Sequence, residues 1–155
     1  MRFFTTLAAV VSSATAVAAV GSAHVVNQCD EDVSVWSVGG EVAGPWRLKA
    51  NGGSYSEEFS RDAVTGGRSL KVTIPEDGLW TGAPQTNFAY NLDGSQVWYD
   101  LSDVFGDAFE GHKLTVSSDN GGCAPIVWED GTPPAGSQVK VCTSDDDLVF
   151  TLCAA

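Results

Sequence analysis

The sequence predicts an all-β domain, and three observations support that prediction. Runs in which apolar or β-branched residues alternate with polar ones recur along the chain, with the period of two that is typical of a half-buried strand. Clusters of glycine, proline and asparagine separate these runs and supply turn chemistry. After the first 19 residues, no 12-residue stretch has the apolar spacing of an amphipathic helix. Short strands without intervening helices indicate an antiparallel sandwich or barrel.

The expected strands follow from these alternating runs. In chain order they are residues 24–27, 33–38, 69–74, 87–92, 96–101, 138–142 and 148–152. Turns are expected where glycine or proline gathers, at residues 39–40, 51–53, 66–67 and 132–136.

The clearest local feature is a hairpin over residues 87–101. Its two alternating runs are joined by Asp93-Gly94, a pair that favours a type I′ turn because both central residues of that turn need positive φ. In the second run, the period of two places Val97, Tyr99 and Leu101 on one face and Trp98 and Asp100 on the other.

Residues 1–19 have the layout of a secretory signal peptide. Arg2 precedes an apolar run, and small residues follow up to a cleavage site at Ala16-Val17-Ala18 or one residue later. Serine and threonine residues interrupt the run, which is too short for a membrane anchor. We therefore expect residues 20–155 to form a single domain that is secreted, extracellular and not attached to a membrane, because no linker or repeat divides it.

The charge balance excludes some classes of partner. The chain has 8 basic and 20 acidic residues, a formal net charge of −12. Nucleic acids and anionic membranes bind through lysine and arginine, so neither is expected as a primary partner. We expect a monomer.

The four cysteines predict two disulfides, because an exported chain reaches an oxidising compartment. Their spacing contains no C-x-x-C pair, which disfavours zinc. Three connectivities are possible. We favour Cys29–Cys153, which ties the first strand to the last, and Cys123–Cys142, which closes a loop; each should stabilise the domain by about 2–4 kcal/mol.

Several strings resemble a known family. Residues 26–29 (VNQC) and 35–39 (VWSVG) resemble the opening strands of thaumatin-like proteins, and the match is closer to a fungal branch, the Blastomyces yeast-phase-specific protein family. The further matching strings are residues 51–57, 81–85, 97–106, 131–140 and 147–153. The resemblance implies a small thaumatin-like antiparallel β-sandwich without a large second lobe, and a pairing of the first and last cysteines. It implies little about activity, because members are mostly described as secreted antigens or candidate effectors.

The candidate ligand-binding residues are Trp98, Asp100 and Asp103. A ring beside a carboxylate can stack on a sugar while the carboxylate accepts hydrogen bonds from its hydroxyls. The resemblance matches Asp100, and also Asp103, to carboxylates of the acidic cleft of plant thaumatin-like proteins, some of which cleave β-1,3-glucan. The resemblance places the cleft glutamate near Ala89, and no arginine sits near the hairpin. Glycoside hydrolysis needs two carboxyl groups, one of them a general acid, so we expect no catalytic residue.

Two metal hypotheses are weaker. Cleavage before His24 would let an N-terminal histidine bind copper with His112, but the earlier cleavage site is better and His24 falls within a strand. The acidic runs 30–32 and 145–147 lack the glycine and glutamate of a calcium loop and fit solvated turns. We expect no metal and no cofactor. Trp80, in an expected loop, is the best candidate among the tryptophans for an exposed contact.

These observations favour a secreted, non-enzymatic fungal protein, an effector or antigen that binds a cell-wall glycan or a host surface protein. A weak β-1,3-glucan hydrolase that uses Asp100 and Asp103 is the alternative. A wall-associated antigen without a defined ligand is the third possibility.

Overall fold

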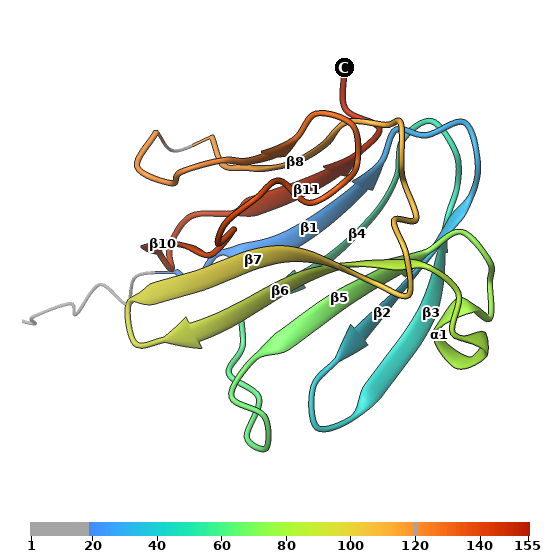
Figure 1. Cartoon of the computed structure of the whole chain (residues 1–155). Coiled ribbons are helices and arrows are strands. Elements are labelled where there is room, and N and C mark those ends of the chain that lie inside the picture. The colour runs from blue at the N-terminus through green and yellow to red at the C-terminus, as the bar shows by residue number, and fades with distance from the viewer. Residues whose placement is uncertain (1–18, 120) are drawn as a thin grey trace, which may run out of the picture.

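The computed structural model describes residues 19–119 and 121–155. The predicted leader, residues 1–19, therefore lies outside the described residues except for its last one. The described chain forms two β-sheets that pack face to face (Figure 1), as the sequence predicts. Its one helix among these residues is a single turn, α1 (Gly78–Thr81). No helix in this part of the chain is long and apolar enough to span a membrane.

The six-stranded sheet carries the central hairpin. Its strands, in spatial order, are β10 (Lys140–Thr143), β7 (Gln96–Val104), β6 (Gln85–Asp93), β5 (Arg68–Thr73), β2 (Val33–Val38) and β3 (Val42–Leu48). All neighbours in this sheet are antiparallel.

The five-stranded sheet covers one face of the first. Its strands, in spatial order, are β4 (Gly53–Glu58), β1 (Ser22–Asn27), β11 (Leu148–Leu152), β8 (Leu114–Ser117) and β9 (Ile126–Trp128). One pair departs from the antiparallel arrangement, because β1 and β11 run parallel.

The parallel pair explains the first disulfide. Parallel pairing places the carboxyl ends of β1 and β11 side by side, with Asn27 opposite Leu152. Cys29 and Cys153 follow those ends and are joined, as the sequence predicts. The second predicted disulfide, Cys123–Cys142, is also present and connects β10 of one sheet to the segment between β8 and β9 of the other.

The core lies between the two sheets. Alternate residues of most strands point into it, and in β7 these are Val97, Tyr99 and Leu101, each at most 1% exposed. The partners of β7 on β6 include Phe88 and Tyr90, which are also buried. We call the opposite side of the six-stranded sheet, which turns away from the other sheet, its outer face.

The predicted hairpin is present, but its turn differs from the expected type. Asp93 pairs with Gln96, so the two central residues are Gly94 and Ser95 rather than Asp93 and Gly94. Gly94 has a φ of 60°, and Ser95 has no positive φ. A positive φ at the first central residue alone is the pattern of a type II′ turn, for which glycine is the usual residue.

Candidate functional site

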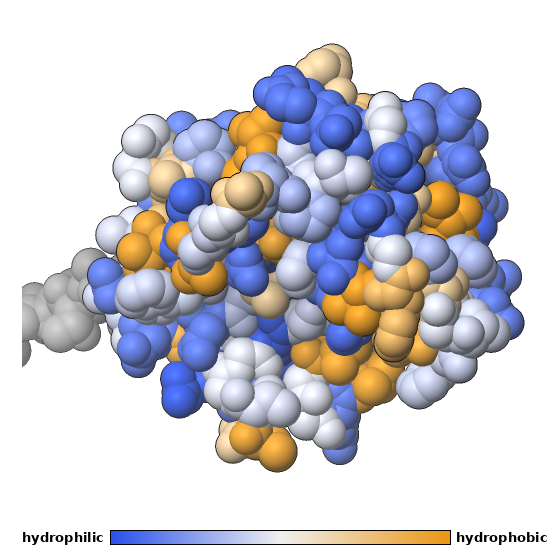
Figure 2. All heavy atoms as spheres, viewed as in Figure 1, coloured by the Kyte–Doolittle hydropathy of each residue, from blue (hydrophilic) through white to orange (hydrophobic). Residues whose placement is uncertain are grey.

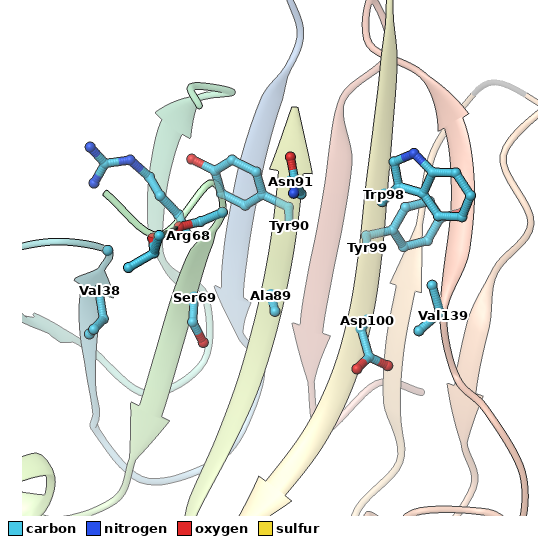
Figure 3. A pocket seen from close by; sticks show the side chains of 13 residues that line it. Val38, Arg68, Ser69, Ala89, Tyr90, Asn91, Trp98, Tyr99, Asp100 and Val139 are labelled. Carbon is cyan, nitrogen blue, oxygen red and sulfur yellow. Dashed lines mark hydrogen bonds between the residues drawn. The ribbon is translucent and has the colours of Figure 1, made fainter. Parts of the chain in front are cut away.

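A groove of about 470 Å³ runs across the outer face of the six-stranded sheet. Its floor is a row of side chains from neighbouring strands, since Val38 pairs with Ser69, Ser69 with Ala89 and Ala89 with Asp100. Figure 3 shows Ser69, Ala89 and Asp100 side by side on β5, β6 and β7. Val139, just before β10, extends the lining beyond Asp100.

Trp98 and Asp100 share this face, as the alternation predicts. Both line the groove, and Trp98 is 44% exposed although it is a large apolar residue. One oxygen of Asp100, Oδ1, accepts a hydrogen bond of 2.9 Å from the N–H of Leu101. An exposed ring thus lies two residues from a carboxylate on the same face. Figure 2 shows hydrophobic and hydrophilic residues intermingled over the side of the molecule that it presents.

The expectation that no arginine sits near the hairpin is wrong, because two arginines that are distant in sequence lie next to it in the folded structure. Arg61 donates from Nη1 to Oδ1 of Asn91 at 3.4 Å, and Asn91 pairs with Trp98. Arg68 also lies on β5 beside the hairpin, where it pairs with Tyr90. Strand pairing brings both arginines to the hairpin from segments 20 to 30 residues earlier, so their proximity has no local signal in the sequence.

Arg68 lines the groove but its guanidinium is engaged elsewhere. Its Nε donates to Oγ of Ser60 at 3.0 Å, and its Nη1 donates to Oγ of Ser37 at 3.4 Å. In Figure 3 the side chains of Arg68 and Tyr90 point away from Asp100. Arg61 is therefore the arginine associated with the outer face at this hairpin.

Asp103 does not share the face of Asp100. Its partner across the ladder is Thr86, whose Oγ1 donates to Oδ1 of Asp103 at 2.5 Å. The other oxygen, Oδ2, is buried and has no hydrogen-bond partner among the described residues. Burial, and secondarily the neighbouring Asp107, raises the pKa of Asp103 to about 7, although the bond from Thr86 opposes that change.

Among the described hollows, Asp100 and Asp103 line the same one only at a second site. This hollow, of about 390 Å³, lies between the end of β7 and residues 133–139, and both Asp100 and Asp103 contribute to its lining. In the main groove, Asp100 is the one carboxylate among the described lining residues. Ala89, the position that the family resemblance assigns to a cleft glutamate, lies directly opposite Asp100. The groove therefore offers an aromatic platform, the amide of Asn91, hydroxyl groups and one carboxylate, which is a set suited to binding a polar ligand.

The two histidines lie at different hollows. His24, on β1, lies 3.7 Å from Asp147 through its Nε2 and lines a hollow with residues 145–147. His112 lines another hollow with Cys29 and Cys153. The described structure therefore does not bring the two imidazoles together as a copper brace requires.

The residues that precede His24 are part of the fold. Gly21 donates its N–H to the carbonyl of Ser144 at 2.7 Å and accepts from the N–H of Phe59 at 2.9 Å. Removing them, as the copper hypothesis demands, would delete the start of β1.

The acidic runs serve the turns in which they lie. Asp32 accepts from Nζ of Lys49 at 2.8 Å and from the N–H of Ala50 at 2.9 Å, and these bonds lower its pKa. Asp147 accepts from the N–H of Ser22 at 2.7 Å. Trp80 is 69% exposed, as expected, although it lies in α1 rather than in an irregular loop.

Comparisons with known proteins agree with this architecture. The family model described as "Blastomyces yeast-phase-specific protein" matches residues 10–154. The chain is 28% identical over 157 residues to the "Antigenic thaumatin-like protein" of Arthroderma benhamiae, covering 96% of this chain and 78% of that protein. It is 26% identical over 145 residues to the "Secreted thaumatin-like protein calA" of Emericella nidulans, covering 85% of this chain and 81% of that protein.

A solved structure is similar in fold. The crystal structure of the protein elicitor MoHrip2 from Magnaporthe oryzae superposes with a TM-score of 0.71 at 24% identity. The match covers 86% of this chain and 99% of that one. With two relatives named as thaumatin-like, this similarity in fold shows that the described residues form a thaumatin-like β-sandwich with two disulfides, as the sequence resemblance implies.

Proposed function

Because the chain belongs to the Blastomyces yeast-phase-specific protein family, we propose that it is a secreted, non-enzymatic protein that binds a cell-wall glycan. The relatives named as secreted or antigenic thaumatin-like proteins support an extracellular location. The binding surface is the groove on the outer face of the six-stranded sheet.

One observation carries the proposal. Trp98 is exposed on a sheet face, with Asn91 and Asp100 near it and Ser69 farther along the same groove as hydrogen-bonding groups. Burying a large aromatic side chain contributes much of the energy at binding surfaces. The polar groups beside the ring suit a ligand that carries hydroxyls as well as apolar C–H faces.

The test is retention of the protein on insoluble fungal wall polysaccharides. Trp98→Ala should weaken binding about tenfold, equivalent to about 1.4 kcal/mol, because the ring supplies the stacking surface. Trp80→Ala is the matched control, since it removes an exposed tryptophan that does not line the groove. Equal binding by wild type and Trp98→Ala would reject this surface. If the protein instead binds a host surface protein and no glycan retains it, the proposed ligand is a protein rather than a glycan.

Secretion would follow removal of residues 1–19. Cleavage there keeps Gly21, whose backbone bonds to Ser144 and Phe59 hold the start of β1. Sequencing the N-terminus of the secreted protein should give a residue before Gly21. A mature protein that begins at His24 would contradict this and revive the copper hypothesis.

Hydrolysis of β-1,3-glucan is a second candidate function, favoured by one observation. The pKa of Asp103, raised to about 7 by burial, keeps its carboxyl largely protonated below that pH, as a general acid requires. Its position on the face opposite Asp100 weighs against a shared reaction centre. Reducing sugar released from laminarin by wild type, and lost in both Asp100→Asn and Asp103→Asn, would establish hydrolysis; no release would exclude it.

A further inference from the structure

Lys71 lies beside the groove on the same face of the sheet. It follows Ser69 by two residues on β5, so its side chain projects from the same side. Strand pairing places Trp36 next to it on β2 and Asn87 on β6, and Asn87 in turn pairs with Ser102. This second row borders the row of Ser69, Ala89 and Asp100 that forms the floor of the groove.

Lys71 has no partner within the described residues. It makes no hydrogen bond or ion pair there, although the chain has 20 acidic residues against 8 basic ones. It is only partly exposed, and this burial lowers the pKa of its ammonium. A partly desolvated cation without a counter-charge is costly, and an anion placed beside it would recover that cost.

Its two neighbours in the row also have unpartnered polar atoms. Trp36 is fully buried and Asn87 is 6% exposed, yet Nε1 of Trp36 and Oδ1 of Asn87 lack a hydrogen-bond partner in the described structure. Buried polar groups are nearly always satisfied by protein, water or ligand. The row therefore contains an ammonium, an indole N–H and an amide oxygen whose bonding capacity is unused.

Other cations gather on this face. Nη1 of Arg47 donates at 2.9 Å to Oγ of Ser34, a residue that shares the face of Trp36. Arg61 reaches the same face through Asn91. Asp32 partly balances Arg47, because its Oδ2 lies 4.0 Å from Nε of that arginine. The positive charge that this face offers to a negative group is therefore that of Lys71 and Arg61.

We propose that the ligand of this face is an acidic saccharide, whose carboxylate binds the ammonium of Lys71 while its hydroxyls meet Asp100 and a neutral sugar face stacks on Trp98. This inference rests on the proposed function and adds the charge of the ligand to it. Lys71 and Asp100 are two strands and two residues apart, about 12 Å between Cα atoms for ordinary strand spacing and rise. An oligosaccharide is long enough to meet both groups at once.

The experiment compares a charged ligand with its neutral methyl ester. Oligogalacturonate and its fully methyl-esterified form share one backbone, and the ester removes the carboxylate charges. Isothermal titration of the mature, disulfide-bonded protein should show the acid binding about tenfold more tightly than the ester at low salt. The preference should shrink as salt rises, since screening weakens exposed ion pairs.

Variants assign the preference to one residue. Lys71→Gln should lose the preference for the acid and keep the affinity for the ester, whereas Lys71→Arg should retain the preference. Lys140→Gln is the matched control, because Lys140 pairs with Tyr99 and so belongs to the opposite face of the same sheet. Far-UV circular dichroism and urea unfolding establish that each variant is folded.

The outcomes separate this inference from the proposed function. Equal affinity for acid and ester, or a preference that survives in Lys71→Gln, overturns the role of Lys71 while groove binding stands. Binding of neutral glucan alone also overturns it. Failure of all these glycans to bind rejects both proposals and leaves ordered water as the partner of Trp36 and Asn87.

Discussion

Removing the two disulfides one at a time should destabilise the domain by different amounts. The perturbations are the double variants Cys29→Ala/Cys153→Ala and Cys123→Ala/Cys142→Ala. A disulfide stabilises mainly by restricting the unfolded chain, and the restriction grows with the length of the closed loop. The sequence separations are 124 residues for Cys29–Cys153 and 19 residues for Cys123–Cys142.

The loop lengths give the expected magnitudes. The chain-entropy relation yields about 5 kcal/mol for the longer loop and about 3 kcal/mol for the shorter one at 25 °C. Cys29, Cys123 and Cys142 are at most 7% exposed and Cys153 is partly buried, so the two pairs lose sulfur atoms of equal volume and broadly similar burial on replacement by alanine. The difference of about 2 kcal/mol between the variants therefore reports the loop lengths.

The assay is urea unfolding at equilibrium, followed by tryptophan fluorescence and extrapolated linearly to zero denaturant. The Cys29→Ala/Cys153→Ala variant should be the less stable of the two. A larger loss for Cys123→Ala/Cys142→Ala would refute the entropic reasoning. It would show that the shorter disulfide, which joins the two sheets, acts mainly through contacts in the folded state.

Two further predictions concern single residues. Because the pKa of Asp103 is raised from 3.8 to about 7 in the folded protein, its contribution to stability is greatest below pH 4 and is lost as the pH rises through 7. At pH 8 the Asp103→Asn variant should therefore be more stable than wild type by about 1–2 kcal/mol, a value that allows for solvent screening of this half-exposed group. At pH 4 the variant should show no such gain. A difference in the free energy of unfolding that does not change with pH, measured by urea unfolding, would contradict this prediction. Gly131 has a φ of 74°, and a Cβ there would collide with the carbonyl of Phe109, so Gly131→Ala should cost more than about 2 kcal/mol. Gly111 is the control, because it has a φ of 86° and open space around it. Gly111→Ala should therefore lower the free energy of unfolding by only about 1 kcal/mol, measured by thermal or urea unfolding. Equal losses of stability in the two variants would contradict the predicted collision at Gly131.

Strands with strong alternation were predictable from the sequence. The ranges expected for β2 and β11 agree with the structure at both ends, since valine-rich runs bounded by turn residues leave little ambiguity. Four strands had no predicted counterpart: β3, β4, β8 and β9. β3 contains Gly44-Pro45 and is almost wholly exposed, and β4 consists of glycine, serine and glutamate apart from Tyr55, its one large apolar residue. Such strands are held by backbone pairing at the sheet edge, which side-chain patterning does not report.

The site was predictable only along single strands. Alternation within β7 correctly places Trp98 and Asp100 on one face and implies that Asp103 belongs to the other. The residues that complete the surface come from other strands: Lys71 from β5, Asn91 from β6 and Arg61 from the segment before β5. Their meeting depends on strand order and register, which local patterns do not determine.

The central claim is that the outer face of the six-stranded sheet binds the ligand. It is tested most directly by titrating ¹⁵N-labelled mature protein with laminarihexaose, chitohexaose and oligogalacturonate while amide chemical shifts are recorded. The account predicts that at least one of these saccharides shifts the amides of Ser69, Ala89 and Trp98, and leaves those of β1 and β11 unchanged. Shifts confined to the five-stranded sheet, or none with any of the three, would contradict it.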